Sequence, residues 1–235
     1  MMEMKAPIVL ALDTPDLETA LGWIKATQDV VSVYKLGLEF YLTFGREGVR
    51  RVLDYTDSDI FLDLKLHDIP HTVGAAALAL SSLRPKYLTI HASGGRAMIA
   101  AAVEALPSSL VTGVTILTSL SEKDISEIGF RENASKSAVA LAGIAVEAGA
   151  RAIVCSPLEI EDIRSAVGNE VTIITPGVRP TDGSPADDQI RTLTPRAAIE
   201  RGANLLVIGR PITGQWVNGP VAMRERAIEI AEQVL

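Results

Sequence analysis

Hydrophobic and polar positions divide this chain into two alternating kinds of segment. Short runs rich in β-branched and apolar residues alternate with longer segments whose apolar residues recur at helical spacing. The pattern predicts strands at Ile8–Asp13, Val31–Gly37, Ile60–Lys65, Tyr87–His91, Leu110–Leu117, Ala152–Cys155, Thr172–Thr175 and Leu205–Ile208. It predicts helices, among others, at Leu17–Ala26, Glu39–Leu53, Thr72–Leu83, Ala97–Leu106 and Ser135–Ala148.

Regular alternation of strands and helices predicts an α/β fold with parallel strands joined by right-handed crossovers. Eight such units in 235 residues favour closure into a single (β/α)₈ TIM barrel that occupies residues 1–235. An open, doubly wound sheet is the alternative. No Gly-x-Gly-x-x-Gly motif follows the first predicted strand, so a dinucleotide site is not indicated. The one long irregular segment, Pro176–Asp188, is typical of a functional loop.

Charge and composition narrow the classes of partner. The net charge of −7 argues against nucleic acids and anionic membranes, which require a basic surface. An anionic small ligand remains possible, because a local cluster of Lys and Arg can hold it. We expect no signal peptide, no membrane span and no intrachain disulfide, since Cys155 is the only cysteine. A cytoplasmic location fits these expectations.

Charged residues interrupt the apolar pattern at the ends of three consecutive predicted strands. Asp13 ends the first, Lys35 lies near the end of the second, and Asp63 and Lys65 end the third. In barrel enzymes the active site lies at the carboxyl ends of the strands. This clustering therefore predicts a catalytic site.

The spacing Asp63-x-Lys65-x-x-Asp68 offers a cation held between two carboxylates. Alternation along a strand predicts that Asp63 and Lys65 share one face, with Asp68 in the loop that follows. Neighbouring carboxylates favour the charged form of a lysine, which we expect to stay protonated and to donate a proton on demand. A purely structural salt bridge is the alternative for a lone pair, but the accompanying charges favour catalysis.

Several segments resemble a known family. Phe61–Thr72, which reads FLDLKLHDIPHT, is similar to the signature of bacterial orotidine 5′-monophosphate decarboxylases. The resemblance continues in order along nearly the whole chain, through Leu10–Asp13, Tyr34–Gly37, Thr115–Ser119, Thr175–Arg179 with Asp187–Gln189, and Val207–Arg210. The resemblance implies conversion of orotidine monophosphate to uridine monophosphate and carbon dioxide, with no cofactor and no metal.

The resemblance also implies residue roles. Lys65 is expected to protonate C6 of the pyrimidine, with Asp63 against the departing carboxylate and Lys35 and Asp68 completing an alternating chain of charges. A homodimer is implied, in which Asp68 and Thr72 reach the neighbouring subunit's site. The substrate-binding residues implied are Asp13, Lys35, Asp68, Thr72, Thr118 or the adjacent Ser119, Arg179, Gln189, Gly209 and Arg210.

Two other functions remain open. One is a metal-dependent phosphosugar decarboxylase or aldolase of the same superfamily, such as a ketogulonate-phosphate decarboxylase or a hexulose-phosphate synthase. The other is a barrel that binds a phosphorylated ligand without catalysis. The spacing of His67, His71 and His91 does not bring three metal ligands together, so structural or surface roles are expected for them.

Overall fold

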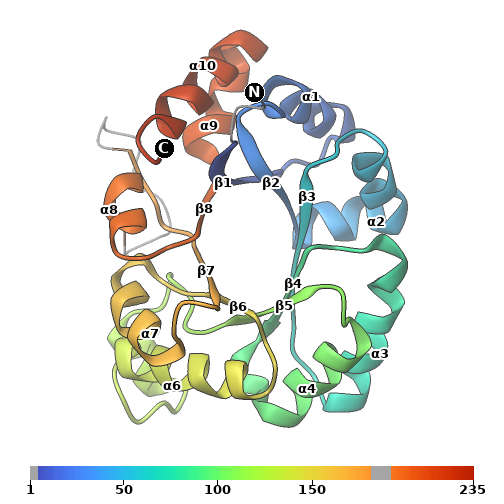
Figure 1. Cartoon of the computed structure of the whole chain (residues 1–235). Coiled ribbons are helices and arrows are strands. Elements are labelled where there is room, and N and C mark those ends of the chain that lie inside the picture. The colour runs from blue at the N-terminus through green and yellow to red at the C-terminus, as the bar shows by residue number, and fades with distance from the viewer. Residues whose placement is uncertain (1–4, 181–191) are drawn as a thin grey trace.

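The computed structural model describes residues 5–180 and 192–235 of the chain. Within these residues eight parallel strands form a closed barrel in which each strand pairs with the next and β8 pairs with β1 (Figure 1). The strands are β1 (Ala6–Ala11), β2 (Val31–Gly37), β3 (Asp59–Leu66), β4 (Tyr87–His91), β5 (Leu110–Val114), β6 (Ala152–Val154), β7 (Thr172–Thr175) and β8 (Leu205–Ile208). The predicted TIM barrel is confirmed, and the open sheet is excluded.

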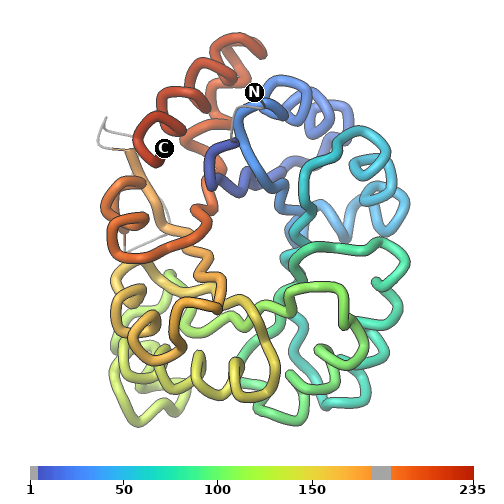
Figure 2. The backbone as a smooth tube through the Cα atoms, viewed as in Figure 1, coloured from blue at the N-terminus to red at the C-terminus, as the bar shows by residue number. Residues whose placement is uncertain are grey.

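Helices surround the barrel on the outside (Figures 1 and 2). They are α1 (Leu17–Thr27), α2 (Leu38–Leu53), α3 (Pro70–Leu80), α4 (Gly95–Ala105), α5 (Glu122–Glu127), α6 (Ala134–Glu147), α7 (Ile160–Val167), α8 (Pro195–Glu200), α9 (Arg210–Thr213) and α10 (Pro220–Ala231). Short 3₁₀ turns lie at η1 (Ser81–Leu83), η2 (Ala92–Gly94), η3 (Pro157–Glu159) and η4 (Gly214–Asn218). No helix among the described residues is long and apolar enough to cross a membrane.

Several element boundaries differ from those that the hydrophobic pattern predicts, and two strand ends bear on the barrel mouth. Strand β1 ends at Ala11 rather than Asp13, and β5 ends at Val114 rather than Leu117. In both places the chain leaves the ladder early, so Asp13 and Thr118 lie on loops at the barrel mouth. Helix α2 is interrupted at Gly45, whose φ of 59° is readily adopted only by glycine.

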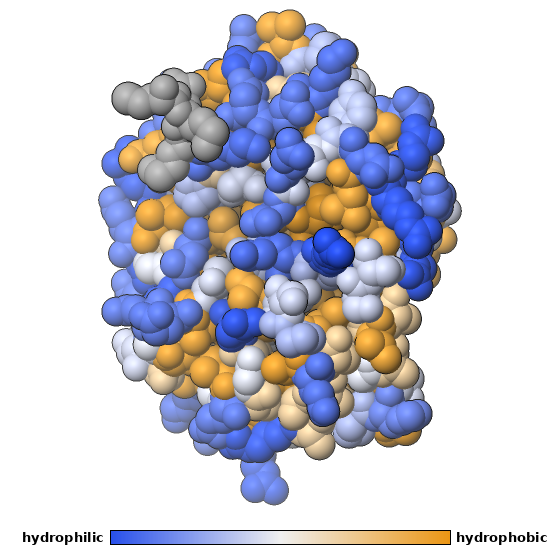
Figure 3. Space-filling model, turned by 45° about the vertical axis from the view of Figure 1, so that its right-hand side comes forward, coloured by the Kyte–Doolittle hydropathy of each residue, from blue (hydrophilic) through white to orange (hydrophobic). Residues whose placement is uncertain are grey.

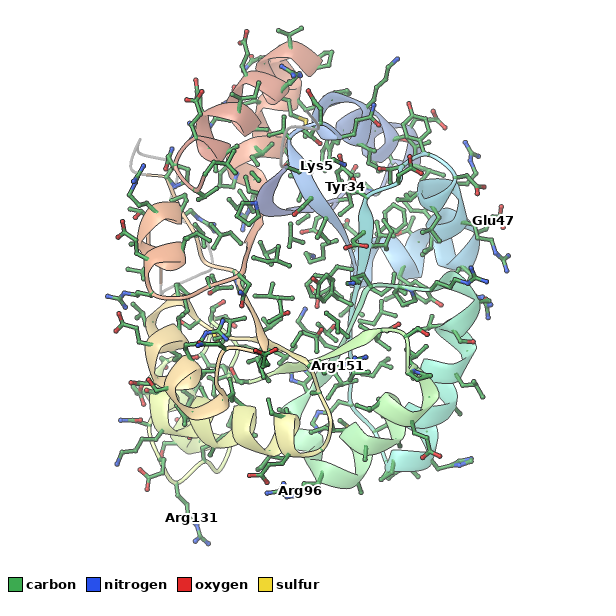
Figure 4. All side chains as sticks on the ribbon, viewed as in Figure 1. Lys5, Tyr34, Glu47, Arg96, Arg131 and Arg151 are labelled. Carbon is green, nitrogen blue, oxygen red and sulfur yellow. The ribbon has the colours of Figure 1, made fainter. Side chains whose placement is uncertain are left out.

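Buried apolar side chains form two clusters, one on each side of the barrel wall. A large cluster lies between the sheet and the helices, and a smaller cluster inside the barrel includes Val33, Phe61 and Tyr87. Figure 4 shows side chains occupying the interior of the ring of strands. Because successive strand residues point to opposite faces, the next interior positions toward the carboxyl ends are Lys35, Asp63 and Thr89. An apolar layer therefore supports a polar layer at the mouth.

Candidate active site

Four charged side chains form a continuous chain at the barrel mouth, one from the loop after β1 and three from the carboxyl ends of β2 and β3. The Lys35 Nζ atom lies 3.4 Å from Asp63 Oδ2, and the Lys65 Nζ atom lies 2.7 Å from Asp63 Oδ1. Lys35 Nζ also lies 3.3 Å from Asp13 Oδ1, on the loop after β1. The side chains of Lys35 and Asp63 are 10% and 13% exposed, against 30% for Lys65 and 56% for Asp13. The centre of this chain is thus buried and its ends reach solvent.

The charges in this chain stabilise one another. Burial alone would lower the pKa of Lys35, but the neighbouring Asp63 and Asp13 carboxylates outweigh burial and raise that pKa. Burial alone would raise the pKa of Asp63, but the Lys35 and Lys65 ammonium groups outweigh it and lower that pKa. Both groups are therefore charged at neutral pH.

The backbone conformation that brings the Lys65 side chain to Asp63 differs from the regular strand alternation that the sequence predicts. Its backbone φ is 48°, in the left-handed region, which costs a non-glycine residue on the order of 1–3 kcal/mol. The pairing of β3 with β4 is irregular between Leu62 and Leu66, which encloses this residue. The predicted meeting of Asp63 and Lys65 is confirmed, but a bulge with a strained backbone produces it. Such strain is concentrated at functional positions.

A pocket of about 510 Å³ opens beside the charged chain. This volume suits a nucleotide-sized ligand. The lining residues come from seven of the eight strands or the segments that follow them: Ala11, Asp13, Lys35, Phe61, Asp63, Lys65, Val114, Ile116, Leu117, Thr118, Val154, Cys155, Pro176, Arg179, Val207, Gly209, Arg210 and Thr213.

The pocket has three chemically distinct walls. The charged chain forms one wall, and apolar residues at or just after the ends of β5 and β6, such as Ile116 and Val154, form another. Arg179 and Arg210 form the third wall, after β7 and β8. Burial and the charge of nearby Arg210 lower the pKa of Arg179, as expected where two guanidinium groups face one space. An anion between them would relieve that repulsion.

The structure brings most of the predicted site residues together. Thr118 lines the pocket, whereas the adjacent Ser119 is exposed and is not among the lining residues. Asp68 and Thr72 are exposed and lie outside the pocket of their own chain. The Asp68 carboxylate accepts a hydrogen bond from the Ile69 backbone N–H at 2.7 Å. Gln189 lies outside the described residues.

The sequence did not single out two residues that contact the charged chain. The Thr89 hydroxyl donates to Asp63 Oδ1 at 3.0 Å. A Cβ atom added at Gly37 would lie 3.1 Å from both Asp13 Oδ1 and Lys35 Nζ, so glycine there leaves room for that ion pair. The signal for Thr89 was its position, two residues beyond Tyr87 on the interior face of β4.

None of the three histidines lines the pocket, and only His67 and His91 are shown near the charged chain. The rings of His67 and His91 are 5.4 Å apart, and burial, followed by His67 and Lys65, lowers the pKa of His91. His71 is exposed at the start of α3. Within residues 5–180 and 192–235, no group of three or more His, Cys, Asp or Glu side chains is arranged to hold a metal ion.

Comparison with known proteins agrees with this geometry. The family model described as "Orotidine 5′-phosphate decarboxylase / HUMPS family" matches residues 6–225. The chain belongs to this family. The orotidine 5′-phosphate decarboxylase of Thermobifida fusca is 52% identical over 210 residues, covering 89% of this chain and 90% of that protein. That of Frankia casuarinae is 46% identical over 227 residues, covering 89% and 82%.

Solved structures of the orotidine 5′-phosphate decarboxylase family share the whole barrel. The orotidine 5′-phosphate decarboxylase of Lactobacillus acidophilus superposes with a TM-score of 0.80 at 31% identity, covering 96% of this chain and 99% of that one. The enzyme from Pyrococcus horikoshii OT3 superposes with a TM-score of 0.78 at 25% identity, covering 97% and 98%. Family membership thus extends from the sequence motif to the complete fold.

Proposed function

We propose that this chain decarboxylates orotidine 5′-monophosphate to uridine 5′-monophosphate in pyrimidine biosynthesis. One observation carries the proposal: the ion-paired chain Lys35–Asp63–Lys65 borders a pocket that also presents Arg179 and Arg210. The relatives at 42–52% identity are named orotidine 5′-phosphate decarboxylases, which supports the same substrate.

The chemistry requires electrostatic help at C6 of the pyrimidine. When the bond from C6 to the carboxylate breaks, its electron pair stays in the plane of the ring, where the π system cannot delocalise it well. A fixed ammonium at Lys65 stabilises that charge and then donates its proton, so that a C6–H bond forms and carbon dioxide leaves. Solvent returns a proton to the neutral Lys65 amine. Asp63 holds Lys65 in place and faces the departing carboxylate.

The remaining pocket residues bind the nucleotide. We propose that Asp13 and Lys35 bind the ribose hydroxyls and that Thr118 contacts the base. Arg179 and Arg210 bind the phosphate, together with Gly209, which joins β8 to α9. Guanidinium groups suit this last task, because they donate pairs of hydrogen bonds to phosphate oxygens. Binding energy from the phosphate, remote from C6, is then available to align the reacting groups. Gln189, also expected at the phosphate, stays a prediction.

A homodimer would complete the site. Asp68 and Thr72 are exposed and do not line the pocket of their own chain, which supports the expectation that they serve the site of a second copy. Exposed apolar side chains flank them on the same side of the barrel: Leu38, Leu42, Ile69 and Leu78. Figure 3 turns this α2–α3 side forward and shows hydrophobic patches between hydrophilic ones. Burying these side chains would favour association. The expected cytoplasmic location also stays a prediction.

The decisive assay follows the absorbance of orotidine monophosphate in the presence of EDTA. We expect turnover that resists the chelator and that Lys65→Ala abolishes, while Lys65→Ala still binds uridine monophosphate by calorimetry. Loss of turnover in EDTA would favour the metal-dependent phosphosugar enzymes. Binding without turnover by the unmodified chain would favour the non-catalytic barrel. Near-normal decarboxylation by Lys65→Ala would refute its role as proton donor.

The shared site has its own test. Lys65→Ala and Asp68→Ala are each expected to be inactive, but an equal mixture should regain about a quarter of full activity. Half of the randomly formed dimers are mixed, and each mixed dimer holds one site with both residues intact. A mixture that stays inactive after subunit exchange, verified by mass spectrometry, contradicts the shared site.

A further inference from the structure

The bulge in β3 leaves a gap in the backbone ladder beside the charged chain. From Leu62 to Leu66, β3 advances four residues, while its partner β4 advances two, from Leu88 to Ile90. Asp63 and Lys65 both lie within this bulge. A bulge leaves the extra residues without regular ladder partners, so the backbone there requires another hydrogen-bonding group.

The Thr89 hydroxyl occupies this gap. Thr89 lies on β4 with no exposed surface. Its Oγ1 atom accepts a hydrogen bond from the Lys65 backbone N–H at 2.9 Å and donates one to Asp63 Oδ1 at 3.0 Å. The Lys65 ammonium donates to that same carboxylate oxygen at 2.7 Å. One hydroxyl therefore fixes both the left-handed backbone of Lys65 and the carboxylate that orients its ammonium.

We propose that Thr89 is a positioning residue for the reaction, holding the Lys65 ammonium and the Asp63 carboxylate in the direction that faces the substrate. This inference rests on the proposed function of Lys65. The hydroxyl is suited to the task because it accepts and donates at once. Valine has the same shape but does neither, and it would leave the Lys65 N–H and Asp63 Oδ1 each short of a partner.

The surroundings of Asp63 support this role. The titratable groups around it are the ammonium groups of Lys35 from β2 and Lys65 from β3, and the imidazole of His91 at the end of β4, whose lowered pKa keeps it neutral at neutral pH. Burial by itself would raise the pKa of Asp63, and the two lysines together with the Thr89 hydroxyl bring that pKa below its ordinary value. The lysines supply most of the charge stabilisation. Thr89 adds an uncharged, directed hydrogen bond to Asp63 Oδ1 that links the carboxylate to the Lys65 backbone.

The test compares Thr89→Ser with Thr89→Ala, which differ by a single hydroxyl group. We expect Thr89→Ser to keep near-normal kcat, and Thr89→Ala to lose about tenfold to a hundredfold in kcat with little change in KM. A matched control is Thr112→Ala. Thr112 is equally buried and pairs with Thr89 across β4 and β5, but its hydroxyl donates to the Leu110 carbonyl, away from the charged chain.

Hydrogen exchange at the Lys65 amide, followed by NMR, gives a readout besides turnover. Loss of the Thr89 acceptor should speed this exchange at least about tenfold in Thr89→Ala relative to Thr89→Ser and Thr112→Ala. If Thr89 only stabilised the fold, Thr112→Ala would slow turnover as well, and the faster hydrogen exchange would not be confined to the Lys65 amide. If Thr89→Ala does not fold, Thr89→Cys replaces it, because a thiol is a much weaker hydrogen-bonding group.

The outcomes separate the two proposals. An unmodified chain that does not consume orotidine monophosphate refutes the proposed function itself. An active chain whose Thr89→Ala variant matches Thr89→Ser in kcat refutes the positioning role alone. Equal losses in Thr89→Ser and Thr89→Ala also refute it, since the methyl group rather than the hydroxyl would then be responsible.

Discussion

Replacing Asp63 by Asn removes the negative charge that two ammonium groups share. Lys35 would keep only Asp13, which is 56% exposed and therefore screened by water. At an effective dielectric constant of about 20, the attraction across the 3.4 Å between Lys35 Nζ and Asp63 Oδ2 is roughly 5 kcal/mol. Removing one partner of a buried pair typically costs about 3–5 kcal/mol. We expect Asp63→Asn to lower the free energy of unfolding by that amount.

An exposed ion pair of the same length provides the control. Lys136 Nζ lies 3.3 Å from Glu132 Oε2, with side chains 70% and 60% exposed. Glu132→Gln should cost less than about 1 kcal/mol, because water already screens that pair. Guanidinium unfolding at neutral pH with linear extrapolation measures both variants, provided their slopes agree. The double variant Lys35→Met/Asp63→Asn should recover part of the loss, because no buried ammonium is left unpaired.

The pH dependence of Asp63→Asn has a definite sign. In the unmodified protein the pKa of Lys35 is raised above 10.5, so its contribution is present below pH 10.5 and is lost as pH rises through the folded-state pKa. Without Asp63, burial dominates and lowers the folded-state pKa of Lys35. The unfolded chain then binds more protons, and the variant gains stability as pH rises toward about 10. The deficit should therefore shrink between neutral pH and about pH 10. A deficit no larger than that of Glu132→Gln, or one that grows with pH, would refute this reasoning.

Two further predictions concern the ends of the site. Arg210→Ala should lower kcat/KM for orotidine monophosphate about tenfold to a hundredfold but leave turnover of phosphate-free orotidine unchanged. The control is Arg131→Ala, which should affect neither substrate because the Arg131 side chain points into solvent in Figure 4. Equal losses on both substrates would argue against a contact between Arg210 and the phosphate. Because the pKa of His91 is lowered in the folded state, its contribution to stability is present above pH 6.5 and is lost as pH falls toward the folded-state pKa. The urea concentration at the unfolding midpoint should therefore decrease less between about pH 7 and pH 5 in His91→Gln than in the unmodified protein. An unchanged slope in that variant assigns the acid loss to other groups.

The apolar pattern was sufficient to predict the barrel, because strands that are buried on both faces appear in the sequence as short apolar runs. Each predicted strand overlaps an observed one, and the differences lie at the ends, where Asp13 and Thr115–Leu117 continue the pattern but leave the ladder. End positions depend on the pairing of neighbouring strands rather than on local pattern. The motif from Asp63 to Asp68 was recognisable because charges are rare at the end of a barrel strand.

The sequence by itself determined the alternation of strands and helices, and it placed Lys35, Asp63 and Lys65 at carboxyl ends that must meet in a parallel barrel. Only the tertiary structure decided how these groups are held. The strained backbone of Lys65 and the choice of Thr118 over Ser119 depend on contacts that no local pattern contains. Thr89 is 24 residues from Lys65 and 26 from Asp63 along the chain. Periodicity predicts the face on which a side chain lies, whereas hydrogen bonds across strands depend on register, which is set when the barrel closes.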